Sequence, residues 1–150
     1  MERNHFPRQL ATMRKSLFDQ GYLDDQFVQL EELQDDVNPN FAEEVVTLFY
    51  RDSARLVQNI EHALERSPLD FAKLDGLMHQ FKDSCSSIGA RKVKYECTQF
   101  REHCRVANAE GCKRSFLQLK KEYSTLQKKL KAYFQFARQA GPVEVACRPN

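Results

Sequence analysis

The chain has 150 residues, of which 41% are hydrophobic and 29% charged, and its formal net charge is +2 at pH 7. This length fits one domain with a single core, and the composition excludes a disordered chain. The near-neutral charge argues against duplex DNA as a partner, and no apolar run approaches the ~20 residues that a membrane-spanning helix needs.

Three helices are predicted in the first half of the chain. The first begins near Pro7 and ends at Gly21, and a short second helix stops before Asn38. The third spans about 41–64 and carries an apolar stripe long enough to cross a bundle. Its candidate N-cap is Asn38 or Asn40.

Three more helices are predicted in the second half. Ser67 and Pro68 mark the clearest helix start, because serine can cap and proline suits the first helical position. Gly89 suits the left-handed end of that helix. A fifth helix covers about 92–106, and the last begins after Asn108 with the three-four alternation of a bundle seam. The chain is therefore predicted to be all-α, with an antiparallel helical bundle at its centre.

The two ends of the chain are expected to be loose tails. These are residues 1–6 and 140–150, which surround a single domain with a core of about 7–139. The N-terminal segment lacks the apolar stretch of a signal peptide. The five cysteines are an odd number, which favours reduced thiols in a cytosolic or nuclear protein. Their spacing indicates core packing, and no metal site is predicted.

His79 is the candidate functional residue. At 100° per residue it lies nearly opposite the apolar stripe of the fourth predicted helix, so its side chain is expected to point into water. An exposed histidine usually has no function, but Gly76 opens an approach to this one and Lys82 places a cation one turn later. Hydroxyl groups gather in the same stretch, at Ser84, Ser86 and Ser87.

Residues 79–90 resemble the signature of a known family. They read His-Gln-Phe-Lys-Asp-Ser-Cys-Ser-Ser-Ile-Gly-Ala, which is similar to His-Gln-x-Lys-Gly-Ser-Ser-x-Ser-x-Gly-Ala of the plant histidine-containing phosphotransfer proteins. The resemblance covers nearly the whole chain. It implies six helices, of which the last four form an antiparallel four-helix bundle. It also implies that His79 accepts the phosphoryl group and that Gln80, Lys82 and Ser84 surround it.

The resemblance further implies a carrier in a multistep phosphorelay. Such a carrier takes phosphate from the receiver domain of a hybrid sensor kinase, typically in cytokinin signalling, and delivers it to response regulators in the nucleus. The partner receiver would supply Mg²⁺, and no cofactor is expected on this chain. The sequence has no P-loop or kinase glycine-rich loop, so we expect a carrier and not an enzyme that uses ATP. We expect a monomer of the cytoplasm and nucleus that binds neither nucleic acid nor membrane.

Asp83 departs from the family pattern, which has glycine at this position. It lies four residues after His79 on the same helix face, where a carboxylate would repel a phosphoryl group. Lys82 is expected to offset part of this repulsion if it pairs with Asp83. Three hypotheses follow: a working carrier, a receiver-binding module that transfers poorly and competes in the relay, and a helical adaptor without phosphate chemistry. The sequence favours the first.

Overall fold

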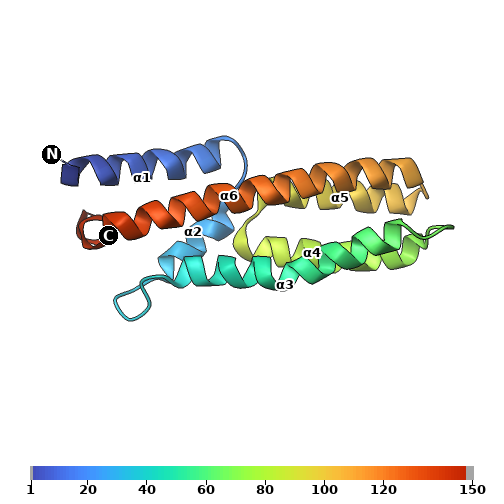
Figure 1. The fold of residues 1–150 in the computed structure, drawn as a ribbon, viewed down its shortest axis with the longest axis horizontal. Coiled ribbons are helices and arrows are strands. Elements are labelled where there is room, and N and C mark those ends of the chain that lie inside the picture. Colours follow the sequence, from blue (N-terminus) through green and yellow to red (C-terminus); the bar gives the residue numbers. More distant parts are fainter. Residues whose placement is uncertain (1, 148–150) are drawn as a thin grey trace.

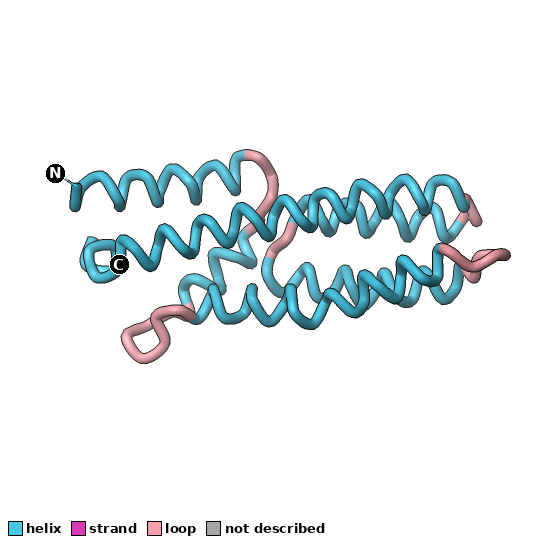
Figure 2. Tube along the Cα trace, in the orientation of Figure 1, coloured by secondary structure: helices cyan, strands magenta, loops and turns pink. Residues whose placement is uncertain are grey.

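The computed structural model describes the backbone of residues 2–147 and the side chains of residues 7–139. It contains six α-helices joined by short loops (Figure 2). They are α1 (Glu2–Asp19), α2 (Asp25–Glu32), α3 (Phe41–Leu64), α4 (Phe71–Ile88), α5 (Arg91–Arg105) and α6 (Ala109–Cys147). The predicted all-α class and the six helices are confirmed.

The last four helices form an antiparallel bundle, as expected (Figure 1). In this bundle α4 packs between α3 and α5, and α5 packs against the first part of α6. The long α6 continues beyond the bundle, and α1 lies alongside this extension (Figure 1). The short α2 packs against α3 and α4, so it connects the α1–α6 pair to the bundle. Among the described residues, no helix is both long enough and apolar enough to cross a bilayer.

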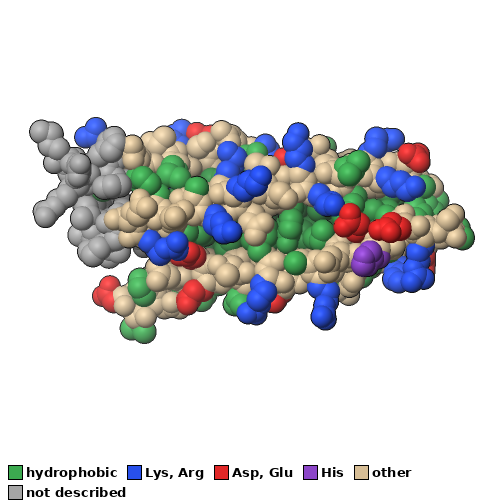
Figure 3. Space-filling view, viewed as in Figure 1, with side chains coloured by type: hydrophobic (Ala, Val, Ile, Leu, Met, Phe, Trp, Pro, Cys, Tyr) green, Lys and Arg blue, Asp and Glu red, His purple; other side chains and the backbone are tan. Residues whose placement is uncertain are grey.

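The core follows the apolar stripes of the helices. Hydrophobic side chains fill the seam between the two pairs of helices, while charged side chains of both signs cover the outer surface (Figure 3). Burial of these stripes is the main stabilising term for helices of this kind. The largest fully buried side chains are Phe27, Phe81, Phe100, Leu23, Ile60, Leu74, Met78, Ile88, Leu119, Leu126, Leu130 and Val93.

The outer ends of α1 and α6 differ from the sequence prediction. The helical backbone of α1 begins at Glu2, so Pro7 lies inside the helix and does not begin it. At the other end, α6 continues to Cys147 through Gly141 and Pro142. Helix-breaking residues cost stability but do not by themselves end a helix. The backbone of 2–6 and 140–147 is therefore helical, and the remaining tail residues lie outside the described part of the chain.

The start of α4 also corrects the prediction. Asp70 is the N-cap, and its Oδ1 accepts a hydrogen bond of 3.1 Å from the backbone N–H of Lys73. Leu69 and Leu74 occupy the two positions of a hydrophobic staple around this cap, and both pack on the core. Ser67 is exposed and precedes the helix. Two good capping residues stand three apart, and the apolar neighbours of the second decide between them.

Replacing Asp70 with alanine is expected to lower the free energy of unfolding by about 1 kcal/mol, because the N–H of Lys73 loses its acceptor. The matched control is Ser67→Ala, which should change stability by no more than about 0.5 kcal/mol. Urea unfolding followed by circular dichroism measures both variants. Equal losses for the two variants would contradict the assignment of the cap.

The N-cap of α3 lies at a predicted residue, but another residue accepts the capping hydrogen bond. Asn40 is the N-cap residue, as predicted, but its side chain makes no capping hydrogen bond. The Oε1 of Gln34 accepts the hydrogen bond from the backbone N–H of Ala42 instead, at 3.2 Å. A residue from the preceding loop thus satisfies a donor that the sequence assigned to a local cap.

Gly89 fixes the turn between α4 and α5 and thereby the register of these two helices. It ends α4 in the left-handed conformation, with φ of 71°, as predicted. Its carbonyl accepts a hydrogen bond of 3.0 Å from the N–H of Asp24. A Cβ at this position would lie 2.4 Å from Oδ1 of Asp24 and 2.8 Å from the backbone nitrogen of Phe27. Only glycine therefore allows the α1–α2 loop to pack against this turn.

Candidate functional site

His79 lies in the middle of α4 on its outer face. The side chains of the opposite face are fully buried, namely Leu74, Met78, Phe81, Cys85 and Ile88. Their burial fixes the rotation of the helix, and His79 is consequently directed outward with 55% of its side chain exposed. This is the orientation expected from the sequence. Gly76, one turn earlier, is exposed, and a Cβ there would meet no atom within 4 Å, so the approach to the ring is open on that side.

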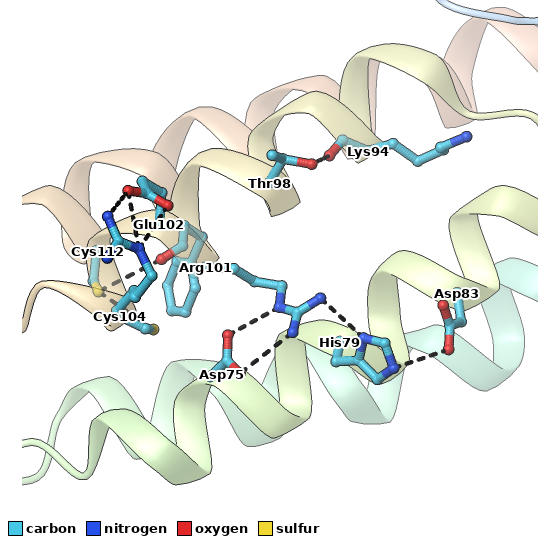
Figure 4. Close-up of polar contacts among 11 residues, drawn as sticks. Asp75, His79, Asp83, Lys94, Thr98, Arg101, Glu102, Cys104 and Cys112 are labelled. Carbon is cyan, nitrogen blue, oxygen red and sulfur yellow. Dashed lines mark hydrogen bonds and ion pairs between the residues drawn. The ribbon is translucent and has the colours of Figure 1, made fainter.

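Arg101 of α5 is the residue at this site that the sequence did not single out. Its Nη1 lies 2.9 Å from Nδ1 of His79 (Figure 4). Its other edge is bound by Asp75, with Nε 2.9 Å from Oδ1 and Nη2 3.4 Å from Oδ2. The hydrogen bond to Asp75 raises the pKa of Arg101, so the guanidinium stays charged. A cation from the neighbouring helix therefore stands beside the ring.

Asp83 lies on the other side of the ring (Figure 4). Its Oδ2 is 3.5 Å from Nε2 of His79, and 70% of its side chain is exposed. The carboxylate is thus directed at the imidazole and not away from it. The expected pair between Lys82 and Asp83 does not form among the described residues, because Lys82 is directed to the groove between α4 and α5.

The hydroxyl groups of α4 bind the helix that carries them. Ser84 donates to the carbonyl of Gln80 at 3.3 Å, and Ser86 donates to that of Lys82 at 3.2 Å. Ser87 donates to the carbonyl of Ser84 at 2.6 Å. Such bonds to the preceding turn are the usual local solution for serine inside a helix. The structure therefore gives these hydroxyls a local role, and they do not converge on the His79 ring.

The groove beside the site is shallow and charged. It runs between α4 and α5 and is lined by Asp75, Lys82, Thr98, Arg101 and Glu102, among others. Lys82 and Arg101 together place two cations on the α5 side of His79. An exposed imidazole next to two cations is suited to hold a dianionic group on a ring nitrogen.

Three cysteines and His103 have structural surroundings among the described side chains. Burial raises the pKa of the Cys85, Cys104 and Cys112 thiols, which keeps them in the unreactive protonated form. His103 packs against Gly111, where a Cβ would lie 2.3 Å from its Nδ1. No group of three or more potential metal ligands occurs among the described residues.

The chain is similar to proteins of a known family. The model of the Hpt domain family matches residues 44–129. The chain is 68% identical over 116 residues to histidine-containing phosphotransfer protein 4 of Arabidopsis thaliana, covering 77% of this chain and 91% of that protein. It is 58% identical over 149 residues to pseudo histidine-containing phosphotransfer protein 5 of Oryza sativa subsp. japonica, covering 99% and 98%.

A solved structure shows the same architecture. The histidine-containing phosphotransfer protein MtHPt2 of Medicago truncatula superposes with a TM-score of 0.86 at 43% identity, and the match covers 97% of each chain. The matched Hpt model spans α4 and α5, on which the His79 site is built. The chain therefore belongs to the plant family of histidine-containing phosphotransfer proteins.

Proposed function

We propose that this protein carries a phosphoryl group on His79 in a multistep His–Asp phosphorelay. It accepts the group from the receiver domain of a hybrid sensor kinase and passes it to a response regulator, in cytokinin-type signalling in the cytoplasm and nucleus. The observation that carries the proposal is the exposed imidazole on the flank of α4, with Arg101 at 2.9 Å and Lys82 in the adjoining groove.

The chemistry uses an accessible imidazole on this chain and a phosphorylated aspartate on the partner. A neutral imidazole is a competent nucleophile near neutral pH. Its nitrogen forms a bond to phosphorus while the bond from phosphorus to the aspartyl oxygen of the receiver breaks, and the carboxylate leaves with the electron pair. The receiver contributes Mg²⁺, and this chain contributes the ring, its orientation and the two cations. The protein is therefore a carrier whose partners supply the catalytic groups.

A second function is favoured by one specific observation, the position of Asp83. A carboxylate 3.5 Å from Nε2 opposes the arrival of a dianion at that nitrogen. The protein would then bind receivers but transfer poorly, and so compete with other carriers. The names of the relatives leave this alternative open, since the rice protein described above is called a pseudo phosphotransfer protein and the Arabidopsis one is not.

Transfer from a radiolabelled, phosphorylated receiver domain tests the proposal. We expect label on the wild-type protein and none on His79→Gln. The matched control is His62→Gln, which removes another exposed imidazole, on α3, and should be labelled like the wild type. Receiver binding is measured separately by titration calorimetry. Binding without any label on the wild type would overturn the carrier function and support the competitor.

A further inference from the structure

The hydrogen bond to Nδ1 of His79 and the carboxylate near Nε2 determine where the proton of the ring lies. A guanidinium has only donors, so Arg101 Nη1, 2.9 Å from Nδ1, must donate to a lone pair on that nitrogen. A neutral imidazole carries one proton, which then lies on Nε2. Nε2 faces the carboxylate of Asp83 at 3.5 Å, and an ionised carboxylate only accepts. Both neighbours therefore select the same tautomer.

Asp75 fixes the direction from which Arg101 approaches the His79 ring. It binds Nε and Nη2 of Arg101, which leaves Nη1 as the free corner of the guanidinium. Asp75 is one turn before His79 on α4, so the carboxylate and the imidazole follow each other along one face. Because the fork of arginine is planar and rigid, binding at one edge sets the direction of the remaining donor. That donor meets Nδ1.

We propose that Arg101, oriented by Asp75, is a positioning residue that holds His79 in the tautomer protonated on Nε2. The inference rests on the proposed function and describes the ring before and after transfer. Nδ1 is covered by Arg101, whereas among the described side chains the polar contact of Nε2 is with the exposed Asp83, so Nε2 is the nitrogen that a receiver reaches. A protonated Nε2 has no lone pair in the ring plane. The resting ring is thus held in the form that cannot attack.

Attack then requires a defined sequence of proton movements. Nε2 loses its proton to solvent, Nδ1 takes one up from solvent, and Arg101 releases the ring. Nε2 forms its bond to phosphorus as the phosphorus–oxygen bond of the aspartyl phosphate breaks, and the electron pair leaves with the carboxylate. The proton on Nδ1 then returns to solvent. Phosphorus now stands where the proton was, and Nδ1 accepts from Arg101 again. Arg101 therefore favours the resting and phosphorylated rings over the attacking tautomer.

The tautomer is measured directly by two-bond ¹⁵N–¹H correlation on ¹⁵N-histidine-labelled protein, at about pH 8.5, where imidazoles are ordinarily neutral. The His79 signals are assigned by their loss in His79→Gln. We expect the wild-type ring to be protonated on Nε2. Arg101→Met removes the donor at similar side-chain length and should raise the fraction protonated on Nδ1 about tenfold. Arg101→Gln keeps an amide donor and should restore most of the wild-type ratio.

The matched control is Arg105→Met, which removes an exposed arginine one turn along α5 that pairs with Glu102. It should leave the His79 signals unchanged, and thermal melting by circular dichroism verifies that each variant is folded. A wild-type ring protonated on Nδ1, or identical His79 shifts in wild type and Arg101→Met, would overturn the proposal. The measurement needs no partner, so a failed transfer assay with the expected shifts overturns the proposed function alone.

Discussion

Replacing Asp83 with asparagine is expected to raise the rate of phosphoryl transfer to His79 about tenfold. Two unit charges about 5 Å apart repel by roughly 0.8 kcal/mol in water. A phosphoryl group carries nearly two charges, so the carboxylate costs about 1.5 kcal/mol, which corresponds to about tenfold. The high-dielectric figure applies because 70% of the Asp83 side chain is exposed. Rates of label transfer from a phosphorylated receiver measure the effect.

Two further variants separate the charge of Asp83 from its size. Asp83→Ala removes the carboxylate with little cost to the helix, whereas Asp83→Gly restores the family residue but lowers helix stability by roughly 1 kcal/mol. If charge dominates, all three variants should transfer at similar rates. A gain confined to Asp83→Gly would show that steric access by the receiver is the limiting factor.

Asp52→Asn is the control for the change of net charge, because it neutralises an exposed carboxylate on α3 that lies outside the site. It should transfer at the wild-type rate. Transfer that is equally fast in wild type and Asp83→Asn would contradict an inhibitory role for the carboxylate. Higher ionic strength should reduce the difference in transfer rate between wild type and Asp83→Asn, because salt screens exposed charges.

Phe81→Ala is expected to lower the free energy of unfolding by about 4 kcal/mol. Phe81 is fully buried on the face of α4 opposite His79. Its ring centroid lies 5.6 Å from that of Tyr123 on α6 and 6.3 Å from that of Phe49 on α3, so it joins three helices of the bundle. Truncation leaves a cavity that these helices cannot close fully. Such a loss is a large part of the total stability of a small domain.

Urea unfolding followed by circular dichroism measures this loss. Leu117→Ala is the matched control, because Leu117 is an apolar residue on α6 with 69% exposure. Its truncation should change stability by no more than about 0.5 kcal/mol. Similar losses for the two variants would contradict the placement of Phe81 at the centre of the core. Phe81→Leu keeps most of the buried volume and should fall between them.

The features that the sequence predicts well are set within single helices. The outward direction of His79 follows from the apolar positions of α4 alone, since a period of 3.6 residues fixes which side of one helix is buried. Gly89 could likewise be predicted, because its left-handed conformation is a local property of the chain. The approach of Asp83 to the ring follows from the spacing of four residues.

The contact between His79 and Arg101 could not be predicted in this way. It joins two helices, and its register depends on the turn at Gly89 and on the packing of α4 against α5. The periodicity of α5 places Arg101 at the edge of its buried stripe but does not say which residue of α4 it meets. The expected pair of Lys82 with Asp83 failed for a related reason. Lys82 lines the groove between α4 and α5, and the sequence of α4 alone does not reveal this groove.

The choice among competing local signals is also decided by tertiary contacts. Ser67 and Asp70 are both good caps, and the packing of the leucine before Asp70 on the core selects the second. The serine hydroxyls of α4 looked available for function, but each has a backbone carbonyl of its own helix within reach. The presence of serines in a helix therefore does not show whether their hydroxyls bind a partner or the backbone of their own helix.

The open position of His79 on the flank of α4 has a kinetic consequence for the proposed carrier. The ring is more than half exposed, so a donor receiver and an acceptor receiver approach it along the same line. By microscopic reversibility, the phosphoryl group leaves for a receiver through the same kind of transition state by which it arrives from one, so the groups beside the ring act on both directions. Repulsion by Asp83 therefore slows arrival of the phosphoryl group and shortens its stay on His79. The site therefore serves transfer in both directions, and the net direction of phosphoryl transfer is set by which partners are phosphorylated.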